Sequence, residues 1–234
     1  EFRAKNQVMQ KAISELLPLT KERYTRESIL KPPPTANAYI CGSDQVWNFV
    51  KCFDDPTYFF DFTKSMKNVK RIGYAPSIAD PWPKSRWEEF KGYLSHMDII
   101  SVREKSDVPV VEKLSGKPVT HVVDPVFLKT REYWDNLSQD MNIKEHYIFC
   151  YFLGTNDLAV NLVNKVKQLT GFKIVHLNLN ARDRFNSDYN LRAVSPQQFI
   201  GLIKNASYVC TNSFHCSAFS IIFRKNYFVA PKGF

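Results

Sequence analysis

Four short polar stretches contain most of the side chains that could do chemistry. Each one follows a run of apolar residues of the kind that forms a buried strand: residues 42–48 (GSDQVWN), 75–77 (APS), 103–107 (REKSD) and 211–220 (TNSFHCSAFS). In open α/β sheets, ligands bind beyond the carboxyl ends of the strands. The four stretches are therefore predicted to converge on one cleft.

The last stretch predicts an anion site at the start of a helix, with Asn212 and Ser213 as predicted substrate-binding residues. Thr211, Asn212 and Ser213 stand at a strand-to-helix turn, where any of them could cap the helix that follows. The unpaired N–H groups of a first helical turn, together with the helix dipole, favour a phosphate or a carboxylate. His215 in that turn could exchange a proton with a bound molecule, and a packed or solvated histidine is the alternative. Cys216 is not expected to act as a nucleophile with His215, because adjacent helical side chains point about 100° apart.

Arg103 is the candidate cation of the third stretch. Its planar guanidinium could hold a carboxylate or phosphate through two hydrogen bonds, and a surface ion pair with Glu104 is the alternative. The first two stretches add hydroxyl, carboxylate and amide groups that could bind a polar ligand, and these belong to Ser43, Asp44, Gln45 and Ser77.

Three other features have ordinary structural explanations. Asp124 precedes a proline and is interpreted as a turn residue, although its carboxylate could also bind a hydroxyl. Trp47 and the aromatic run 58–62 could stack on a sugar ring or fill the core, and their spacing leaves both open. The five cysteines are odd in number and lack CxxC spacing, so we predict reduced thiols and neither a disulfide framework nor a metal site.

Short β-branched and aromatic runs alternate with amphipathic ones, which is typical of parallel sheets with crossover helices. The predicted strands are residues 38–41, 70–74, 98–102, 120–123, 147–152, 173–177 and 208–210. Helices are predicted over residues 156–170, capped by Asn156, and over residues 195–205, where a proline follows Ser195. The polar connection 128–146 contains no predicted strand. We therefore predict two lobes, residues 1–135 and 136–234.

Composition limits the class of protein. The 234 residues are 44% hydrophobic and 14% aromatic, which is enough to bury a core and excludes a disordered chain. No run of eighteen apolar residues and no charged-then-apolar leader occurs, so a soluble chain is expected. The net charge of +9 favours an anionic partner. The basic residues are dispersed along the sequence, which disfavours a non-catalytic domain that binds nucleic acid or a membrane.

Five segments occur in an order that resembles the polysaccharide pyruvyl transferase family: YICGSDQVWN, RIGYAPSIAD, DIISVREKS, HVVDPVFL and YVCTNSFHCSAFSIIFRKNYFV. The resemblance implies an α/β fold of two Rossmann-like lobes with parallel sheets in a GT-B-like arrangement, with the active site in the cleft between them. It also implies transfer of a pyruvyl group from phosphoenolpyruvate to a sugar of a cell-surface polysaccharide, such as an exopolysaccharide, or of its lipid-linked precursor. The product would be a pyruvate ketal. His215 and Arg103 match charged active-site positions of the family, and we expect both to be catalytic.

Two departures from the family pattern stand out. Cys216 follows the histidine where family members often have glycine. Family members also begin with a strand and a glycine-containing loop before the first helix, and they continue past the last strand predicted here. The sequence begins at Glu1 and ends at Phe234, so we expect it to be a piece of a longer protein, with further loops missing around residues 177–190.

The resemblance carries expectations about partners and place. No cofactor or metal is expected besides phosphoenolpyruvate as donor substrate, because an arginine and a helix start can hold its phosphate. A cytoplasmic protein is expected, with loose contact to the inner membrane face through its positive charge and with no nucleic-acid partner. A glycosyltransferase that uses a nucleotide sugar is the alternative, because the same fold and helix start suit a diphosphate. The acceptor sugar and the oligomeric state stay open.

Overall fold

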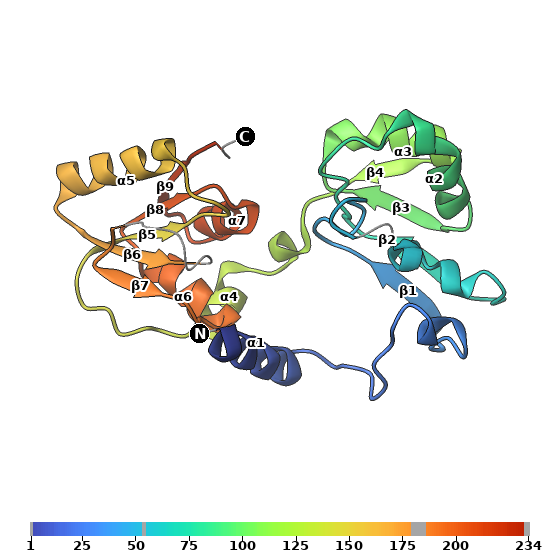
Figure 1. The fold of residues 1–234 in the computed structure, drawn as a ribbon, viewed down its shortest axis with the longest axis horizontal. Helices are drawn as coiled ribbons and strands as arrows, with labels where there is room; N and C mark the ends of the chain where they lie inside the picture. The colour runs from blue at the N-terminus through green and yellow to red at the C-terminus, as the bar shows by residue number, and fades with distance from the viewer. Residues whose placement is uncertain (1, 53–54, 179–185, 232–234) are drawn as a thin grey trace. The chain divides into compact units, whose positions relative to one another are not determined.

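The computed structural model describes residues 2–52, 55–178 and 186–231, and the chain folds into two compact units (Figure 1). Residues Thr20–Pro125 form one unit, which we call the four-stranded unit. Residues Glu1–Leu19 and Val126–Phe234 form the other, the five-stranded unit. The boundaries of these units differ from the predicted boundary between residues 135 and 136, because the N-terminal helix is part of the same unit as the second half of the chain.

The four-stranded unit is built on a fully parallel sheet in the order β1-β2-β3-β4. Its strands are β1 (Ala38–Cys41), β2 (Lys70–Gly73), β3 (Ile99–Val102) and β4 (Val119–His121), and its α-helices are α2 (Trp87–Leu94) and α3 (Val108–Ser115). Short 3-10 turns occupy Ser28–Leu30, Pro56–Phe59, Asp61–Thr63, Lys84–Arg86 and Lys105–Asp107, and Pro125–Leu128 forms another at the unit boundary. Parallel pairing places the carboxyl ends of all four strands at one edge.

Aromatic rings fill the core of this unit. Trp47 stacks on Phe59 at 5.0 Å between ring centroids, and Trp82 stacks on Phe90 at 4.1 Å. The Trp82 indole N–H donates to the carbonyl of Trp47 at 2.9 Å. Trp47 is 1% exposed. For Trp47 and the phenylalanines of the aromatic run, the structure therefore supports core packing and not sugar stacking, whereas Tyr58 is 44% exposed.

The five-stranded unit has a parallel sheet in the order β7-β6-β5-β8-β9. Its strands are β5 (Tyr147–Tyr151), β6 (Lys173–Leu177), β7 (Tyr189–Leu191), β8 (Tyr208–Thr211) and β9 (Asn226–Val229). Its helices are α1 (Phe2–Leu16), α4 (Arg131–Leu137), α5 (Asp157–Thr170), α6 (Pro196–Asn205) and α7 (Phe214–Ile222).

Helices cover both faces of this second sheet. Alternate residues of β5 point to opposite faces, so that Ile148 packs with α5 while Phe149 packs with α6 and α7. Figure 1 shows α5 on one side of the sheet and α6 on the other. Both predicted caps are confirmed: the side chain of Asn156 accepts from the first turn of α5, and Ser195 forms a reciprocal capping box with Gln198 at the start of α6.

The predicted fold class, α/β with two parallel sheets, is confirmed, and all seven predicted strands occur within two residues of their predicted ends. The sequence analysis missed β7 and β9, which are the two edge strands of their sheet. Of the predicted stretch 177–190, residues 179–185 lie outside the described residues. No helix in the described part of the chain is long and apolar enough to cross a membrane.

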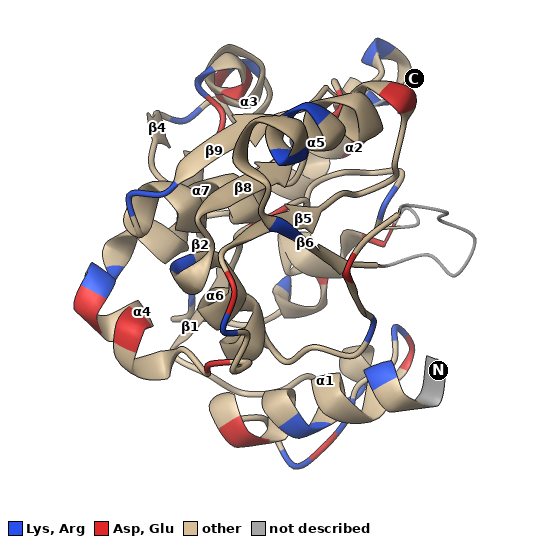
Figure 2. Ribbon diagram, turned by 90° about the vertical axis from the view of Figure 1, so that its left-hand side faces the viewer, with Lys and Arg blue, Asp and Glu red and all other residues tan. Residues whose placement is uncertain are grey.

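The net charge of +9 is spread over the structure. Figure 2 shows basic and acidic residues interspersed along both α1 and α4. On α1, for example, Lys11 lies 3.8 Å from Glu15 across one helical turn. A charge distribution of this kind is typical of a solvated surface.

Candidate active site

Side chains that follow β1, β3 and β4 meet at the carboxyl edge of the four-stranded sheet. The Ser43 hydroxyl donates to Asp124 Oδ2 at 2.7 Å, and Arg103 Nη1 donates to the same oxygen at 3.1 Å. The Asp124 side chain is 1% exposed. A buried carboxylate must be paired and hydrogen-bonded to remain charged, and Ser43 and Arg103 supply both interactions.

Arg103 is the centre of this group, which we call the Arg103 cluster and which comprises Ser43, Asp44, Arg103, Glu104 and Asp124. Besides Asp124, the guanidinium donates from Nε to Glu104 Oε1 at 2.9 Å and from Nη1 to Asp44 Oδ1 at 3.4 Å. Burial alone would lower the pKa of Arg103, but the hydrogen bonds to Glu104 and Asp124 outweigh it, and the pKa is raised. The cluster thus holds a permanent cation that is only 8% exposed.

The predicted ion pair between Arg103 and Glu104 is present, but it is not a surface pair. Surface ion pairs contribute little, whereas a buried arginine depends on the carboxylates around it. Asp44 differs from the other acids of the cluster because its side chain is 61% exposed. It is therefore the most accessible carboxylate of the cluster, since the Glu104 side chain is 35% exposed.

Backbone bonds hold the three predicted stretches of this unit in register. Ser77 N–H donates to the carbonyl of Asp44 at 2.8 Å, and Arg103 N–H donates to the carbonyl of Pro76 at 3.2 Å. Gly42 is required where the first stretch turns: its φ is +133°, and a Cβ there would lie 1.9 Å from the carbonyl oxygen of Tyr74. The glycine lets the loop after β1 approach the loop after β2.

Two of the predicted binding residues lie beside the cluster, and their side chains form no hydrogen bond with it among the described residues. Gln45 accepts from the side chain of Asn48 at 3.2 Å, so it belongs to a supporting network that continues to Asp80. Ser77 is 1% exposed, and its hydroxyl has no hydrogen-bond partner among the described residues. Their assignment to substrate binding stays a prediction.

The sequence analysis interpreted Asp124 as a turn residue. This interpretation is incomplete, because it gives no role to the carboxylate. Its carboxylate is buried and bonds two predicted site residues. The signal that could have found it is topological, because Asp124 follows β4 just as the other stretches follow β1, β2 and β3. In a parallel sheet these four positions share one edge.

One acid of the cluster, Glu104, lies close to a further acid, Asp107. Asp107 Oδ2 and Glu104 Oε2 are sealed from solvent and have no hydrogen-bond partner among the described residues. Burial, followed by the nearby charge of Glu104, raises the pKa of Asp107. The Asp107 carboxyl therefore takes up a proton more readily than an exposed aspartate does.

The start of α7 is a second candidate site, within the five-stranded unit. Ser213 is the N-cap, as predicted, and its hydroxyl accepts from the N–H of Cys216 at 3.4 Å. Asn212 Oδ1 accepts from Leu153 N–H at 2.7 Å, and its Nδ2 donates to the carbonyl of Gly154 at 3.1 Å. The Asn212 amide thus braces the loop after β5.

His215 lies in the first turn of α7, half-buried, with its ring edge-to-face against Phe214 at 5.2 Å. The adjacent Cys216 is 0% exposed, and burial raises the pKa of its thiol to about 12. A protonated, buried thiol is a poor nucleophile. Cys216 is therefore not a candidate nucleophile, and a role for His215 in proton transfer stays a prediction.

Neither the Arg103 cluster nor the start of α7 resembles a metal site among the described residues. No group of three or more His, Cys, Asp or Glu side chains within residues 2–52, 55–178 and 186–231 is placed to hold a metal ion. The groups that could hold a ligand are the start of α7, which suits an anion, and the Arg103 cluster, which offers a fixed cation beside an exposed carboxylate.

A comparison with protein families gives one match. A family model described as polysaccharide pyruvyl transferase matches residues 10–229, which is nearly the whole chain and includes both the Arg103 cluster and the start of α7. No curated protein matches the chain.

Proposed function

The chain belongs to the polysaccharide pyruvyl transferase family, and we propose that the pyruvyl group it transfers comes from phosphoenolpyruvate. The acceptor in this proposal is a sugar of a cell-surface polysaccharide or of its lipid-linked precursor. The product is a cyclic pyruvate ketal. We place the reaction in the cytoplasm, where phosphoenolpyruvate is made, with the positive net charge supporting loose contact with the inner membrane face.

In the proposed reaction, one carbon of the donor loses its bond to the phosphate oxygen and gains bonds to two sugar oxygens. A proton adds to the methylene carbon of phosphoenolpyruvate, which becomes a methyl group, and one sugar hydroxyl attacks the adjacent carbon. The bond from that carbon to the phosphate oxygen breaks, and inorganic phosphate leaves. A second hydroxyl of the same sugar then closes the ketal ring. Of the two protons that the hydroxyls lose, one replaces the proton added to the methylene carbon and the other leaves with the phosphate. The protein must hold anionic groups and move a proton.

The position of His215 is the observation that carries this proposal. It lies in the first turn of α7, where the N–H groups of the helix start and the helix dipole favour the anionic groups of the donor. A histidine at such a place can give a proton to one atom of the bound donor and take one from an attacking hydroxyl. Ser213, as the N-cap, fixes the geometry of this turn.

Arg103 is proposed to contribute to donor binding as a cation that is in position before the donor arrives. Asp124 and Glu104 hold its guanidinium by hydrogen bonds of 3.1 and 2.9 Å. Charge that is fixed in advance needs no reorganisation when negative charge develops on the leaving phosphate. The exposed carboxylate of Asp44 could accept the hydrogen bond of a sugar hydroxyl.

The test is to incubate the purified protein with phosphoenolpyruvate and the lipid-linked glycan intermediates of the source organism. We expect inorganic phosphate and a glycan whose mass has increased by one ketal. Phosphate released without the ketal would contradict transfer to the sugar.

Ligand binding separates this proposal from a nucleotide-sugar glycosyltransferase. A ligand that binds only the folded protein raises the midpoint of thermal unfolding in proportion to its saturation. We expect phosphoenolpyruvate to raise the midpoint and a panel of nucleotide sugars to leave it unchanged. The reverse result would favour the glycosyltransferase.

A further inference from the structure

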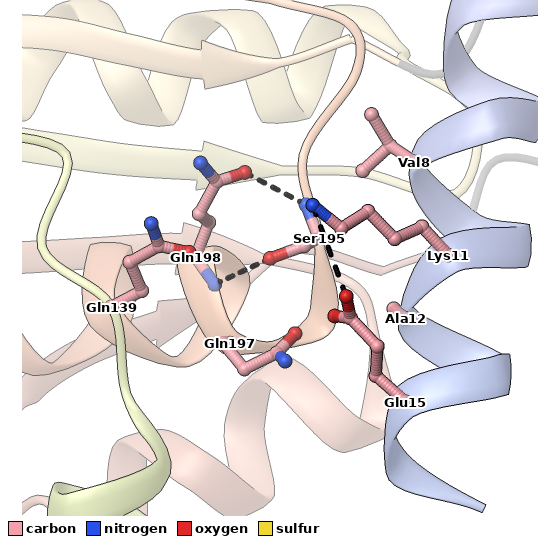
Figure 3. A pocket seen from close by; sticks show the side chains of 8 residues that line it. All are labelled: Val8, Lys11, Ala12, Glu15, Gln139, Ser195, Gln197 and Gln198. Carbon is pink, nitrogen blue, oxygen red and sulfur yellow. Dashed lines mark hydrogen bonds and ion pairs between the residues drawn. The ribbon is translucent and has the colours of Figure 1, made fainter.

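Buried polar side-chain atoms without a hydrogen-bond partner among the described residues occur in both units. In the five-stranded unit, one of them is Gln197 Oε1, in the lining of a pocket of about 250 Å³ between α1 and the start of α6 (Figure 3). An amide oxygen of this kind carries no proton that it can share. In the four-stranded unit, two such atoms, Glu104 Oε2 and Asp107 Oδ2, belong to neighbouring carboxyl groups. Two carboxyl oxygens, by contrast, can satisfy each other through one shared proton.

A 3-10 turn brings these two acids together. The turn comprises Lys105–Asp107, and the N–H of Asp107 donates to the carbonyl of Glu104 at 3.0 Å. Side chains three positions apart eclipse each other in a 3-10 helix. Glu104 and Asp107 are three positions apart, so the turn directs both carboxyl groups to one side, within hydrogen-bonding reach of each other.

Asp107 occupies a position at which an aspartate usually caps a helix. It is the N-cap of α3, where its side chain is expected to accept from an N–H of the first helical turn. It makes no such hydrogen bond. Its Oδ1 accepts from the Ser106 hydroxyl at 3.2 Å, and its Oδ2 is the atom without a donor. The carboxyl group therefore does not serve α3, although it stands at the capping position.

The two oxygens of Glu104 have different surroundings. Oε1 accepts from Arg103 Nε at 2.9 Å, whereas Oε2 is sealed from solvent and has no donor among the described residues. If Glu104 and Asp107 were both charged, they would repel each other and leave two buried oxygens unsatisfied. A proton on Asp107 Oδ2 removes the repulsion and supplies the donor that Glu104 Oε2 lacks. Glu104 is then held from both sides, by Arg103 and by Asp107.

The groups that face Asp107 favour this proton. Burial raises the pKa of Asp107, and the charge of Glu104 raises it further, while the Ser106 hydroxyl and the backbone of Ile78 lower it. The net effect is a raised pKa. Ile78 belongs to the loop after β2, and Arg103 lies on the far side of Glu104. The lysine of the turn is exposed.

We propose that Asp107 is a positioning residue for the donor: one proton shared by Asp107 Oδ2 and Glu104 Oε2 holds Glu104 on Arg103, and donor affinity falls when this proton is lost. Asp107 acts through Glu104 and does not itself touch the donor. The inference rests on the proposed function, in which Arg103 helps to bind phosphoenolpyruvate. As the pH rises, the proton leaves to solvent, the two carboxylates repel each other, and the guanidinium loses part of its fixed orientation.

The first experiment needs no donor. The intact, isotope-labelled chain is titrated while NMR follows the carboxyl carbon of Asp107 and the Nε–H of Arg103. We expect Asp107 to titrate above the pKa of an ordinary aspartate, about 3.9, and the Arg103 signal to shift at the same pH. Glu104→Gln removes the facing charge and supplies an amide donor, so it should lower the titration midpoint of Asp107. An unchanged midpoint in this variant, or an Arg103 signal that does not follow Asp107, would overturn the shared proton.

The second experiment measures the Kd for phosphoenolpyruvate by calorimetry, below and above the titration midpoint of Asp107. Asp107→Asn supplies an amide donor to Glu104 at every pH, and Asp107→Ala supplies none. Each Kd is divided by that of the unchanged protein at the same pH, which cancels the titration of the donor itself and of His215.

The two variants should show opposite patterns. Asp107→Asn should match the unchanged protein below the midpoint and bind about threefold more tightly, or better, above it. Asp107→Ala should bind about threefold more weakly below the midpoint. Glu88→Gln is the matched control, because it makes the same exchange of carboxyl for amide at a side chain that is 89% exposed on α2. Its ratio should stay at one on both sides of the midpoint.

A ratio for Asp107→Asn that does not change with pH would overturn the link to donor affinity, and so would an equal change in Glu88→Gln. Thermal unfolding of each variant accompanies the titrations, and if Asp107→Ala does not fold, Asp107→Asn decides alone. Phosphoenolpyruvate that bound none of these proteins at any pH would contradict the proposed function instead. The NMR titration contains no donor, so it would still decide whether the proton is shared.

Discussion

The carboxyl edges of the two sheets carry polar residues at equivalent places and use them in different ways. In the four-stranded unit, side chains from different strands bond one another, as Ser43, Arg103 and Asp124 do. In the five-stranded unit, the polar side chains after β8 bond the backbone, with Asn212 bracing one loop and Ser213 capping α7. One edge is a closed network of charges, and the other is a helix start with a histidine in its first turn.

The difference teaches that the two edges should respond differently to substitution. A buried charge network depends on every member, because removal of one leaves another charge unpaired. A helix start keeps its fold when a first-turn side chain is exchanged for one of similar size, so such an exchange acts on chemistry alone. The predictions below test this contrast between stability and activity.

The largest expected effect is that of His215→Gln on turnover. Glutamine can still form hydrogen bonds but cannot exchange a proton, so we expect ketal formation to fall at least about a hundredfold. Binding of phosphoenolpyruvate and the midpoint of thermal unfolding should stay close to those of the unchanged protein. His146→Gln is the control, because His146 precedes β5 at the opposite edge and should have no effect on turnover.

A fall in turnover of less than tenfold would remove His215 from proton transfer. If donor binding collapsed together with turnover, His215 would instead be a contact for the phosphate. The exchange would then not act on chemistry alone, as the contrast between the edges requires.

The second effect is on stability, through Asp124→Ala. This change removes the buried carboxylate that bonds the guanidinium of Arg103, and it leaves the Ser43 hydroxyl with the carbonyl of Ala75 as acceptor, at 3.0 Å. We expect the free energy of unfolding to fall by about 3 kcal/mol, measured by urea denaturation. A loss below about 1 kcal/mol would show that the cluster is not a mutually dependent network. Ser106→Ala, at an exposed position in the loop after β3 that also contains Arg103, is the control and should cost little.

A third effect separates charge from geometry at Arg103. Lysine keeps the positive charge, but it cannot donate to Glu104 and Asp124 from two fixed nitrogens at once. We expect Arg103→Lys to raise the KM for phosphoenolpyruvate about tenfold, which corresponds to about 1.4 kcal/mol, and to lower stability measurably as well. An unchanged KM in steady-state assays would confine Arg103 to a structural role.

The smallest effect concerns the pH dependence of stability. Burial raises the pKa of Asp107, so the folded state holds a proton there that the unfolded state has lost. The stability it contributes is present below the pKa of an ordinary aspartate, about 3.9, and is lost as pH rises through the higher folded-state pKa. Asp107→Asn should remove this decline and make the protein slightly more stable near neutral pH.

Asp188→Asn should have the opposite sign. The N–H of Ile174 and the side chain of Lys167 lower the pKa of Asp188 to about 2. Its contribution is therefore present above pH 4 and fades as pH falls toward about 2. The asparagine variant should be less stable near neutral pH, as measured by thermal unfolding across the pH range. Equal signs for the two variants would contradict the assigned environments.

Sequence analysis predicted the parts of the fold that local pattern specifies. The strand at residues 173–177 and the helix at 157–170 follow from residue type, spacing and an asparagine cap, and the structure confirms both. β9 was missed because all four of its residues are exposed at the edge of a sheet, and β7 because it is only three residues long with a polar centre. β7 lacks the apolar run that marks a buried strand, whereas the apolar run at residues 227–229 of β9 was not recognised as a strand.

The candidate site was predicted less completely, because contacts decide it. Arg103 and His215 were singled out by residue type at the end of a strand and the start of a helix, but their partners lie elsewhere in the chain. Asn212 was predicted to bind substrate, and its amide braces a neighbouring loop 58 and 59 residues away. No local pattern could show that use.

The sequence by itself determined that apolar runs alternate with amphipathic ones and that polar residues follow the strands, because those features depend only on neighbours a few positions apart. Only the tertiary structure decided that Trp47 belongs to the core and that Asp124 anchors Arg103. Ser43 and Asp124 are 81 residues apart in sequence, and Arg103 and Asp124 are 21 apart. Parallel pairing of β1 to β4 brings them to one edge, where burial excludes water and makes their hydrogen bonds obligatory.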